Sequence, residues 1–160
     1  MATQNGSPAD NVAPSLNVLA QYIKDLSFEN PNAPNSLASP AGQPDVSVQI
    51  NVNARPLANN EFEVELKVDG KASVQGNTMF AFDLTYGGIF RIQGIPEQSL
   101  QPVVLIECPR LLFPFARQIV ADAVRNGGFP PLMIDPVDFA SLYQQRMMAE
   151  AQRFQPVGQA

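Results

Sequence analysis

The side chains best suited to chemistry in this sequence are the carboxylates that alternate along residues 61–69. Glu61, Glu63 and Glu65 recur at every second position, which places them on one face if the segment is a β-strand. Two carboxylates that converge in a cleft can act as an acid–base pair when their environments push their pKa values apart. An acid–base enzyme is therefore one alternative, although the predicted face belongs to an open sheet and not to a cleft.

Other kinds of catalysis lack the residues they need. The 160-residue chain contains no histidine, which excludes serine–histidine and cysteine–histidine catalysis and histidine-ligated metal sites. Its one cysteine, Cys108, has no histidine base, so we expect a buried and inert thiol. Gly87-Gly88 falls within a predicted strand, where it favours close backbone packing over phosphate binding. The sequence predicts no enzyme, no cofactor and no metal.

Charge is unevenly distributed along the chain. The net charge is −5, and residues 1–100 carry ten acidic and five basic side chains, whereas residues 101–160 carry five of each. The excess negative charge argues against a nucleic-acid or anionic-membrane surface and favours a basic partner. We see no signal peptide and no apolar run long enough to span or insert into a bilayer, and the lone cysteine fits a reducing compartment. We therefore expect a cytoplasmic protein.

Alternation of apolar and polar residues predicts four antiparallel β-strands. They cover residues 22–29, 46–53, 61–69 and 78–95, with a proline-rich crossing loop at 30–44. Even-numbered residues are mainly apolar and should face the helices, whereas odd-numbered residues should face away. The outward set includes the acids Asp25, Glu29, Glu61, Glu63, Glu65 and Asp83, diluted by Lys67, with Ile23, Met79 and Ala81 as apolar positions. This acidic face is either an ordinary solvated surface or a docking surface for a basic partner.

Helical periodicity in the second part of the chain predicts helices at about 109–126 and 139–153. The glycines after Asn126 should end the first helix, and Asp138 should cap the second. Pro114 should make the start of the first helix irregular. Residues 103–148 carry more apolar side chains than one helix can bury under four strands, so the excess belongs to the domain core, an oligomer interface or an exposed groove.

These patterns fit one domain of the α+β class. Strands followed by helices predict a four-stranded antiparallel sheet with two C-terminal helices packed on one face. The polar N-terminus at residues 1–14 and the last residues, 154–160, should be disordered, which leaves a single domain at 15–153.

The sequence resembles the SecB export chaperones from about Tyr22 to Met147. The motifs that carry the resemblance are YIKDLSFENPNAP, QPDVSVQINV, FEVELKV, GGIFRIQGI, CPRLLFPFAR and GGFPPLMIDPVDFASLY. The resemblance implies an ATP-independent molecular chaperone that binds unfolded secretory preproteins, keeps them translocation-competent and delivers them to the SecA motor. It also implies a SecB-like fold that assembles as a homotetramer, a dimer of dimers.

The same resemblance implies three sets of site residues. SecA, through its zinc-bearing C-terminal tail, would dock on Asp25, Glu29, Ala81 and Asp83. Client polypeptide would bind a groove that includes Leu37, Val46, Phe139, Leu142, Tyr143 and Met147. Subunits would join through Cys108, Leu112, Phe115, Ile119, Val120 and Val124. At Gly42 the chain departs from family members that carry a tryptophan just before the Gln-Pro pair.

A small-ligand carrier is a further alternative. A cup formed by the sheet and helices would close over a lipid or metabolite, which predicts an enclosed cavity and a monomer. The chaperone hypothesis predicts instead shallow apolar grooves, in which weak contacts along one long client add up through avidity.

Overall fold

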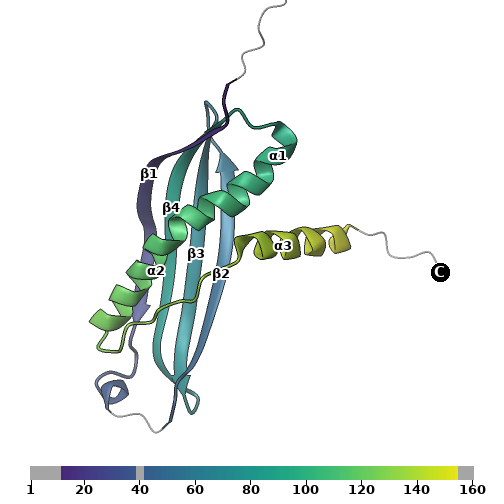
Figure 1. Cartoon of the computed structure of the whole chain (residues 1–160). Coiled ribbons are helices and arrows are strands. Elements are labelled where there is room, and N and C mark those ends of the chain that lie inside the picture. The colour runs from purple at the N-terminus through teal and green to yellow at the C-terminus, as the bar shows by residue number, and fades with distance from the viewer. Residues whose placement is uncertain (1–11, 39–41, 155–160) are drawn as a thin grey trace, which may run out of the picture.

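The four strands form one antiparallel sheet. The computed structural model describes residues 12–38 and 42–154, and most of the two tails predicted to be disordered lies outside these described residues. The strands are β1 (Ser15–Glu29), β2 (Asp45–Pro56), β3 (Glu61–Val74) and β4 (Asn77–Gln93), in the order β1-β4-β3-β2. Because β1 and β2 follow each other in sequence but lie at opposite edges, the loop between them crosses the end of the sheet (Figure 1). The four predicted strands are confirmed, with shifted ends.

The helical half begins earlier than predicted. Helix α1 (Glu97–Pro102) passes through a π-helical turn, η2 (Val103–Glu107), into α2 (Cys108–Asn126). In this turn the Cys108 N–H donates to the Val103 carbonyl, five residues back. Pro109, which follows, has no N–H to give. The helix start is irregular as predicted, but the irregularity lies before Pro109, and α2 continues through Pro114.

Both predicted helix caps are present. Gly128 has a φ of +97°, and the N–H of Phe129 donates to the Val124 carbonyl at 3.3 Å, which is the bonding pattern of a glycine C-cap. An extended connector, residues 129–138, leads to α3 (Phe139–Arg153). The Asp138 side chain accepts a hydrogen bond from the Ser141 N–H at 3.1 Å, as expected for an N-cap.

Helix α2 covers one face of the sheet, mainly over β3 and β4 (Figure 1). The core between them contains fully buried residues of both layers: Val64, Leu66, Val68, Leu84, Phe90, Leu112, Val120 and Val124. A Cβ atom on Gly88 would lie 2.9 Å from Cδ2 of Leu112 and 2.8 Å from the Phe90 ring. The missing side chain lets the helix approach the sheet, so the prediction of close packing at this glycine is confirmed.

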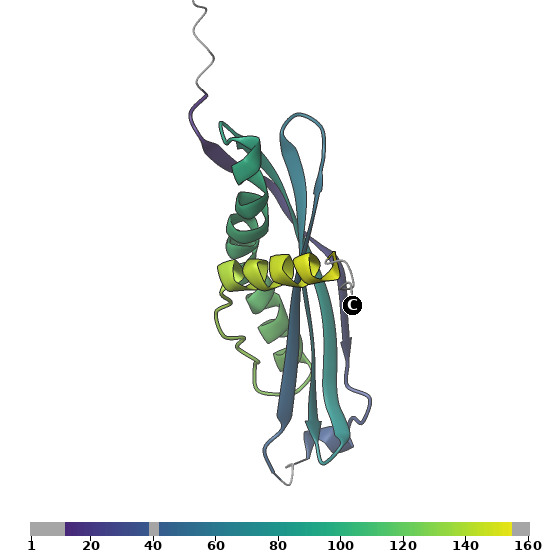
Figure 2. The ribbon, with the colours of Figure 1, turned by 90° about the vertical axis from the view of Figure 1, so that its right-hand side faces the viewer.

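The second helix departs from the prediction that both helices pack on one face. Helix α3 runs away from the sheet past its β2 edge (Figures 1 and 2). Phe139 is the one buried residue in α3, and its ring lies 6.0 Å from that of Phe113 in an edge-on arrangement. Farther along, Arg146 donates from its guanidinium to the Val52 carbonyl on β2 at 2.7 Å. The prediction of packing on the sheet face was wrong for α3. This helix is held instead by Phe139 and Leu142, which pack against the core, by contact with the π-helical turn η2, and by Arg146 at one edge carbonyl.

Strand β1 also departs from simple alternation. Its pairing with β4 shifts between Val18 and Ala20 and again between Ile23 and Asp25. Each shift adds a residue to β1 and changes which parity faces the helices. Tyr22 therefore lies on the outer face, opposite Gly87, while Ile23 pairs with the core residue Tyr86. The predicted outward position of Ile23 was wrong for this reason.

Candidate functional site

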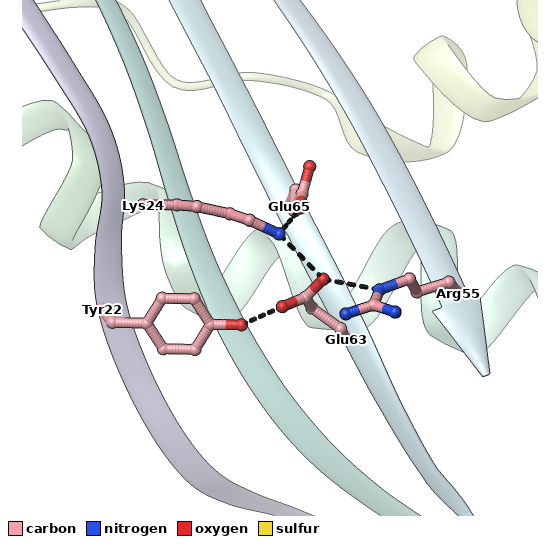
Figure 3. A network of polar contacts seen from close by, with 5 residues as sticks. All are labelled: Tyr22, Lys24, Arg55, Glu63 and Glu65. Carbon is pink, nitrogen blue, oxygen red and sulfur yellow. Dashed lines mark hydrogen bonds and ion pairs between the residues drawn. The ribbon is translucent and has the colours of Figure 1, made fainter. Parts of the chain in front are cut away.

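The outer face of the sheet contains a polar network centred on Glu63 of β3 (Figure 3). Only 7% of Glu63 is exposed. Its carboxylate accepts hydrogen bonds from the Tyr22 hydroxyl at 2.5 Å, the Arg55 Nε at 2.8 Å and the Lys24 ammonium at 3.1 Å. Lys24 also binds Glu65. The network thus joins β1, β3 and β2 across the width of the sheet.

A glycine makes room for this network. Tyr22 must pass over β4 to reach β3, and it does so at Gly87, where a Cβ atom would lie 2.7 Å from the tyrosine ring. Gly87 and Gly88 thus serve opposite faces, since the first lies under Tyr22 and the second under Leu112.

Electrostatics in the network oppose acid–base catalysis. Hydrogen bonds from Tyr22, then Arg55, then Lys24 lower the pKa of Glu63 from 4.5 to about 2, against the opposing effect of burial. Burial, with the hydrogen bond to Glu63, raises the pKa of Tyr22 to about 12. An acid–base enzyme predicts convergent carboxyl groups with a raised pKa, whereas this carboxylate stays ionised and is held by cations.

The remaining outer acids lie toward the end of β1. Asp25 pairs with Thr85, Ser27 with Asp83, and Glu29 with Ala81, so these residues occupy three alternate rows of the β1–β4 ladder, all on the outer face. Asp69 on β3 lies directly opposite Asp83, on the outer face that its odd-numbered position predicts.

The two halves of the outer face therefore differ in charge. Glu61 pairs with Arg91 at 2.7 Å, and Glu63 and Glu65 belong to the network. Among the described residues, no cation pairs with Asp25, Glu29, Asp69 or Asp83. Four unpaired carboxylates thus gather where β1 ends, beside the unpaired Lys67 and Lys71, so this half of the face keeps a net negative charge among the described residues.

An open hollow of about 650 Å³ lies between the β2 edge and α3. Leu142 and Tyr143 line it from α3, Ile50 and Val52 from β2, and Leu105 from the π-helical turn. Arg146 crosses it to reach the Val52 carbonyl. The hollow is not the enclosed cavity that a small-ligand carrier requires.

The structure brings together only part of the predicted client groove. Leu142 and Tyr143 line the hollow, and Phe139 anchors α3 beside it in the core. Met147 is half-buried on the same helix, and Val46 is exposed near the start of β2. Leu37 lies elsewhere, at the crossing loop, where its Cδ2 would be 2.7 Å from a Cβ atom on Gly128.

The predicted oligomer residues divide by burial. Cys108, Leu112, Val120 and Val124 are fully buried within the single chain. They have no surface left for a second subunit, so the prediction was wrong for these four. Burial raises the pKa of the Cys108 thiol to about 12, as expected of an inert cysteine. Phe115 is 52% exposed and Ile119 is half-buried, so both retain surface.

The residues that sequence reasoning missed are Tyr22, Lys24, Arg55 and Arg146. A signal existed for Lys24, because a charged residue at an even position interrupts the apolar parity of its strand. Nothing in the sequence marks Arg146 as the partner of a β2 carbonyl. Among the described residues, no group of three or more acidic or cysteine side chains is placed to hold a metal ion. No described helix is long and apolar enough to cross a membrane.

Comparisons with known proteins agree with this architecture. The family model for the preprotein translocase subunit SecB matches residues 9–150. The protein-export protein SecB of Azorhizobium caulinodans is 82% identical over 160 residues, which cover 100% of both chains. That of Xanthobacter autotrophicus is 77% identical over 155 residues, covering 97% of this chain and 99% of its own.

A solved structure shares the fold at low sequence identity. A SecB-like chaperone of Mycobacterium tuberculosis, in complex with a ChAD peptide from an antitoxin, superposes with a TM-score of 0.64 and 16% identity. The match covers 76% of this chain and 90% of that one.

A four-stranded antiparallel sheet with C-terminal helices, together with these matches, defines the class as SecB-like chaperones. The chain belongs to the SecB family. Its role is that of a SecB chaperone in protein export.

Proposed function

We propose that the hollow between β2 and α3 binds unfolded preproteins and keeps them translocation-competent without ATP. The observation that carries this proposal is an open hollow beside the β2 edge of the sheet, lined by apolar residues together with charged ones such as Lys67, Glu150 and Arg153. Extended chains offer apolar side chains and unpaired backbone groups, and both find partners at such an edge. Val46 and Leu37 extend the proposed path toward the crossing loop, which gives a long client several weak contacts.

The client test uses two neighbouring substitutions on α3. Tyr143 lines the hollow, whereas the next residue, Gln144, is exposed and does not line it. Tyr143→Glu should weaken suppression of aggregation of a slowly folding secretory precursor, measured by light scattering without nucleotide. Gln144→Glu adds the same charge and should leave suppression unchanged. Equal effects of the two variants would rule out the hollow as the client site.

We also propose that SecA docks on the acidic end of the outer face through Asp25, Glu29 and Asp83, with Ala81 between them. The support is charge. These acids are exposed and form no ion pair among the described residues, whereas Glu61, Glu63 and Glu65 at the start of β3 each pair with a cation. The zinc-bearing tail of SecA is the proposed basic partner, and complementary charge chiefly increases its association rate.

The docking test separates binding from folding. Asp25→Lys combined with Asp83→Lys should abolish binding of the SecA tail and leave client holding intact. Asp83→Lys alone is compared with Glu97→Lys, which makes the same charge change on exposed α1. If the Glu97 variant loses as much binding as the Asp83 variant, net charge and not this surface determines the affinity.

A homotetramer, arranged as a dimer of dimers, is the assembly that we propose. Its support is an exposed apolar surface formed by Val18, Leu19, Ile23, Leu26, Leu111 and Phe115 of β1 and α2. A soluble chain that exposes so much apolar surface is expected to cover it. Light scattering should give about 70 kDa, four times the 17.4 kDa of one chain, and Phe115→Asp should lower this mass. A mass near 17 kDa for the wild type would refute the assembly and favour a monomeric carrier.

A further inference from the structure

The geometry assigns Lys24 as a positioning residue for the acidic docking surface. We infer that Lys24 holds the bulge of β1 against Glu63 and Glu65, which turns Asp25 to the outer face beside Asp83. The inference rests on the proposed docking of a basic partner at Asp25, Glu29 and Asp83. Lys24 is a cation, so its charge alone would weaken binding of a basic partner. Its position instead favours that binding, because it keeps Asp25 on the outer face.

The position of Asp25 depends on the bulge. Ile23 pairs with Tyr86 and Asp25 with Thr85, so Lys24 is the extra residue between two consecutive partners on β4. Tyr22 and Lys24 both reach Glu63 on the outer face. Strict alternation would therefore turn Asp25 toward the core, and the inserted residue is what returns it to the outer face. Ser27 and Glu29, which follow, inherit the same orientation.

The contacts of Lys24 anchor this bulge. A bulged residue leaves the hydrogen-bond ladder locally interrupted, so its conformation needs support from elsewhere. The Lys24 ammonium binds Glu63 at 3.1 Å and also binds Glu65, both on β3 and therefore across β4. Tyr22, two residues earlier, also binds Glu63 through its hydroxyl. Two successive outward side chains of β1 thus fix the segment just before Asp25.

The same contacts direct the lysine charge away from the docking surface. Glu65 lies in the row of Tyr22 and Gly87, on one side of Asp25, whereas Asp83 lies in the row of Ser27, on the other side. The ammonium is drawn toward Glu65 and is neutralised there. Two lysines of the same face can be compared with it: Lys67 lies in the row of Thr85 and Asp25, and Lys71 lies in the row of Ala81 and Glu29. Neither has an ion-pair partner among the described residues.

The test depends on whether Lys24→Met strengthens or weakens binding of the SecA tail. If Lys24 acted by charge alone, Lys24→Met would strengthen binding of the basic SecA tail, because it removes a cation and frees two carboxylates. As a positioning residue, the same change should weaken binding about fivefold or more, the usual loss for an important interface residue. Lys71→Met removes an equal charge from the same face and should strengthen binding slightly. Lys24→Arg keeps both contacts and should retain wild-type affinity.

A second measurement does not depend on the partner. Hydrogen exchange of the Asp25–Glu29 amides should be about tenfold faster in Lys24→Met and unchanged in Lys71→Met. Stronger binding by Lys24→Met, or unchanged exchange, would overturn the inference while leaving the docking proposal standing. If the wild type fails to bind the SecA tail, the docking proposal fails, and with it the functional role of Lys24.

Discussion

The network around Glu63 yields a prediction about stability and pH. Glu63→Gln preserves the size of the side chain and an oxygen that can still accept the Tyr22 hydrogen bond, but it removes the charge that binds Arg55 and Lys24. The variant should be less stable than the wild type at pH 7. The deficit should shrink as the pH falls, because protonation removes the same charge from the wild type.

The magnitude follows from the pKa of Glu63. A pKa lowered from 4.5 to about 2 corresponds to about 3 kcal/mol, at about 1.4 kcal/mol for each pKa unit. The Lys24 and Arg55 side chains are 44% and 65% exposed, so solvent screening reduces this to roughly 2 kcal/mol. Because the pKa is lowered by folding, the stabilisation is complete above about pH 4.5 and is lost as the pH falls toward 2.

Urea unfolding followed by far-ultraviolet circular dichroism at pH 7, 4 and 2.5 measures this difference. Chain concentration must be held constant, since assembly contributes to apparent stability. Glu61→Gln is the matched control, because it removes a carboxylate from the same strand. The ion-pair partner of Glu61 is one cation, Arg91, which is 43% exposed. It should cost less than about 1 kcal/mol. A Glu63→Gln deficit that is the same at pH 7 and 2.5, or no larger than that of the control, would refute the reasoning.

Three further substitutions probe the packing. Gly88→Ala should destabilise the chain by about 1–3 kcal/mol in urea unfolding, because its Cβ would lie 2.9 Å from Leu112, and a cost near zero would contradict the close helix–sheet approach. Phe139→Ala removes the buried side chain that anchors α3 and should speed hydrogen exchange throughout that helix, while the β3 and β4 amides stay protected. Uniform loss of protection would mean that α3 does not open separately from the sheet. Asp138→Ala removes the α3 cap and should cost about 1 kcal/mol, whereas Asp138→Asn, which keeps an acceptor for the Ser141 N–H, should cost less.

The local features of this fold were predictable because their causes are local. Alternation with period two predicted the strands, and apolar spacing of three and four predicted the helices. The glycine stop after Asn126 and the Asp138 cap each depend on residues within one or two turns, and both are present. The lone cysteine was also correctly predicted to be buried.

The candidate sites were predicted less completely, because several of their features depend on where distant segments meet. Leu112, Val120 and Val124 were assigned to subunit contacts, yet they face the sheet of their own chain and are fully buried there. Apolar periodicity identifies a buried stripe but does not say which surface buries it. The exposed residues beside the stripe, such as Phe115, are visible only once the helix is placed on the sheet.

Sequence alone determined that this chain forms strands with one acidic face, that two helices follow them, and that it resembles the SecB chaperones. Tertiary structure alone decided which acids remain free. Glu63 and Glu65 meet cations from β1 and β2, whereas Asp25 and Asp83 meet none among the described residues. The physical reason is that charge compensation depends on partners from different strands, and each of the two extra residues in β1 reverses the side to which the side chains after it point.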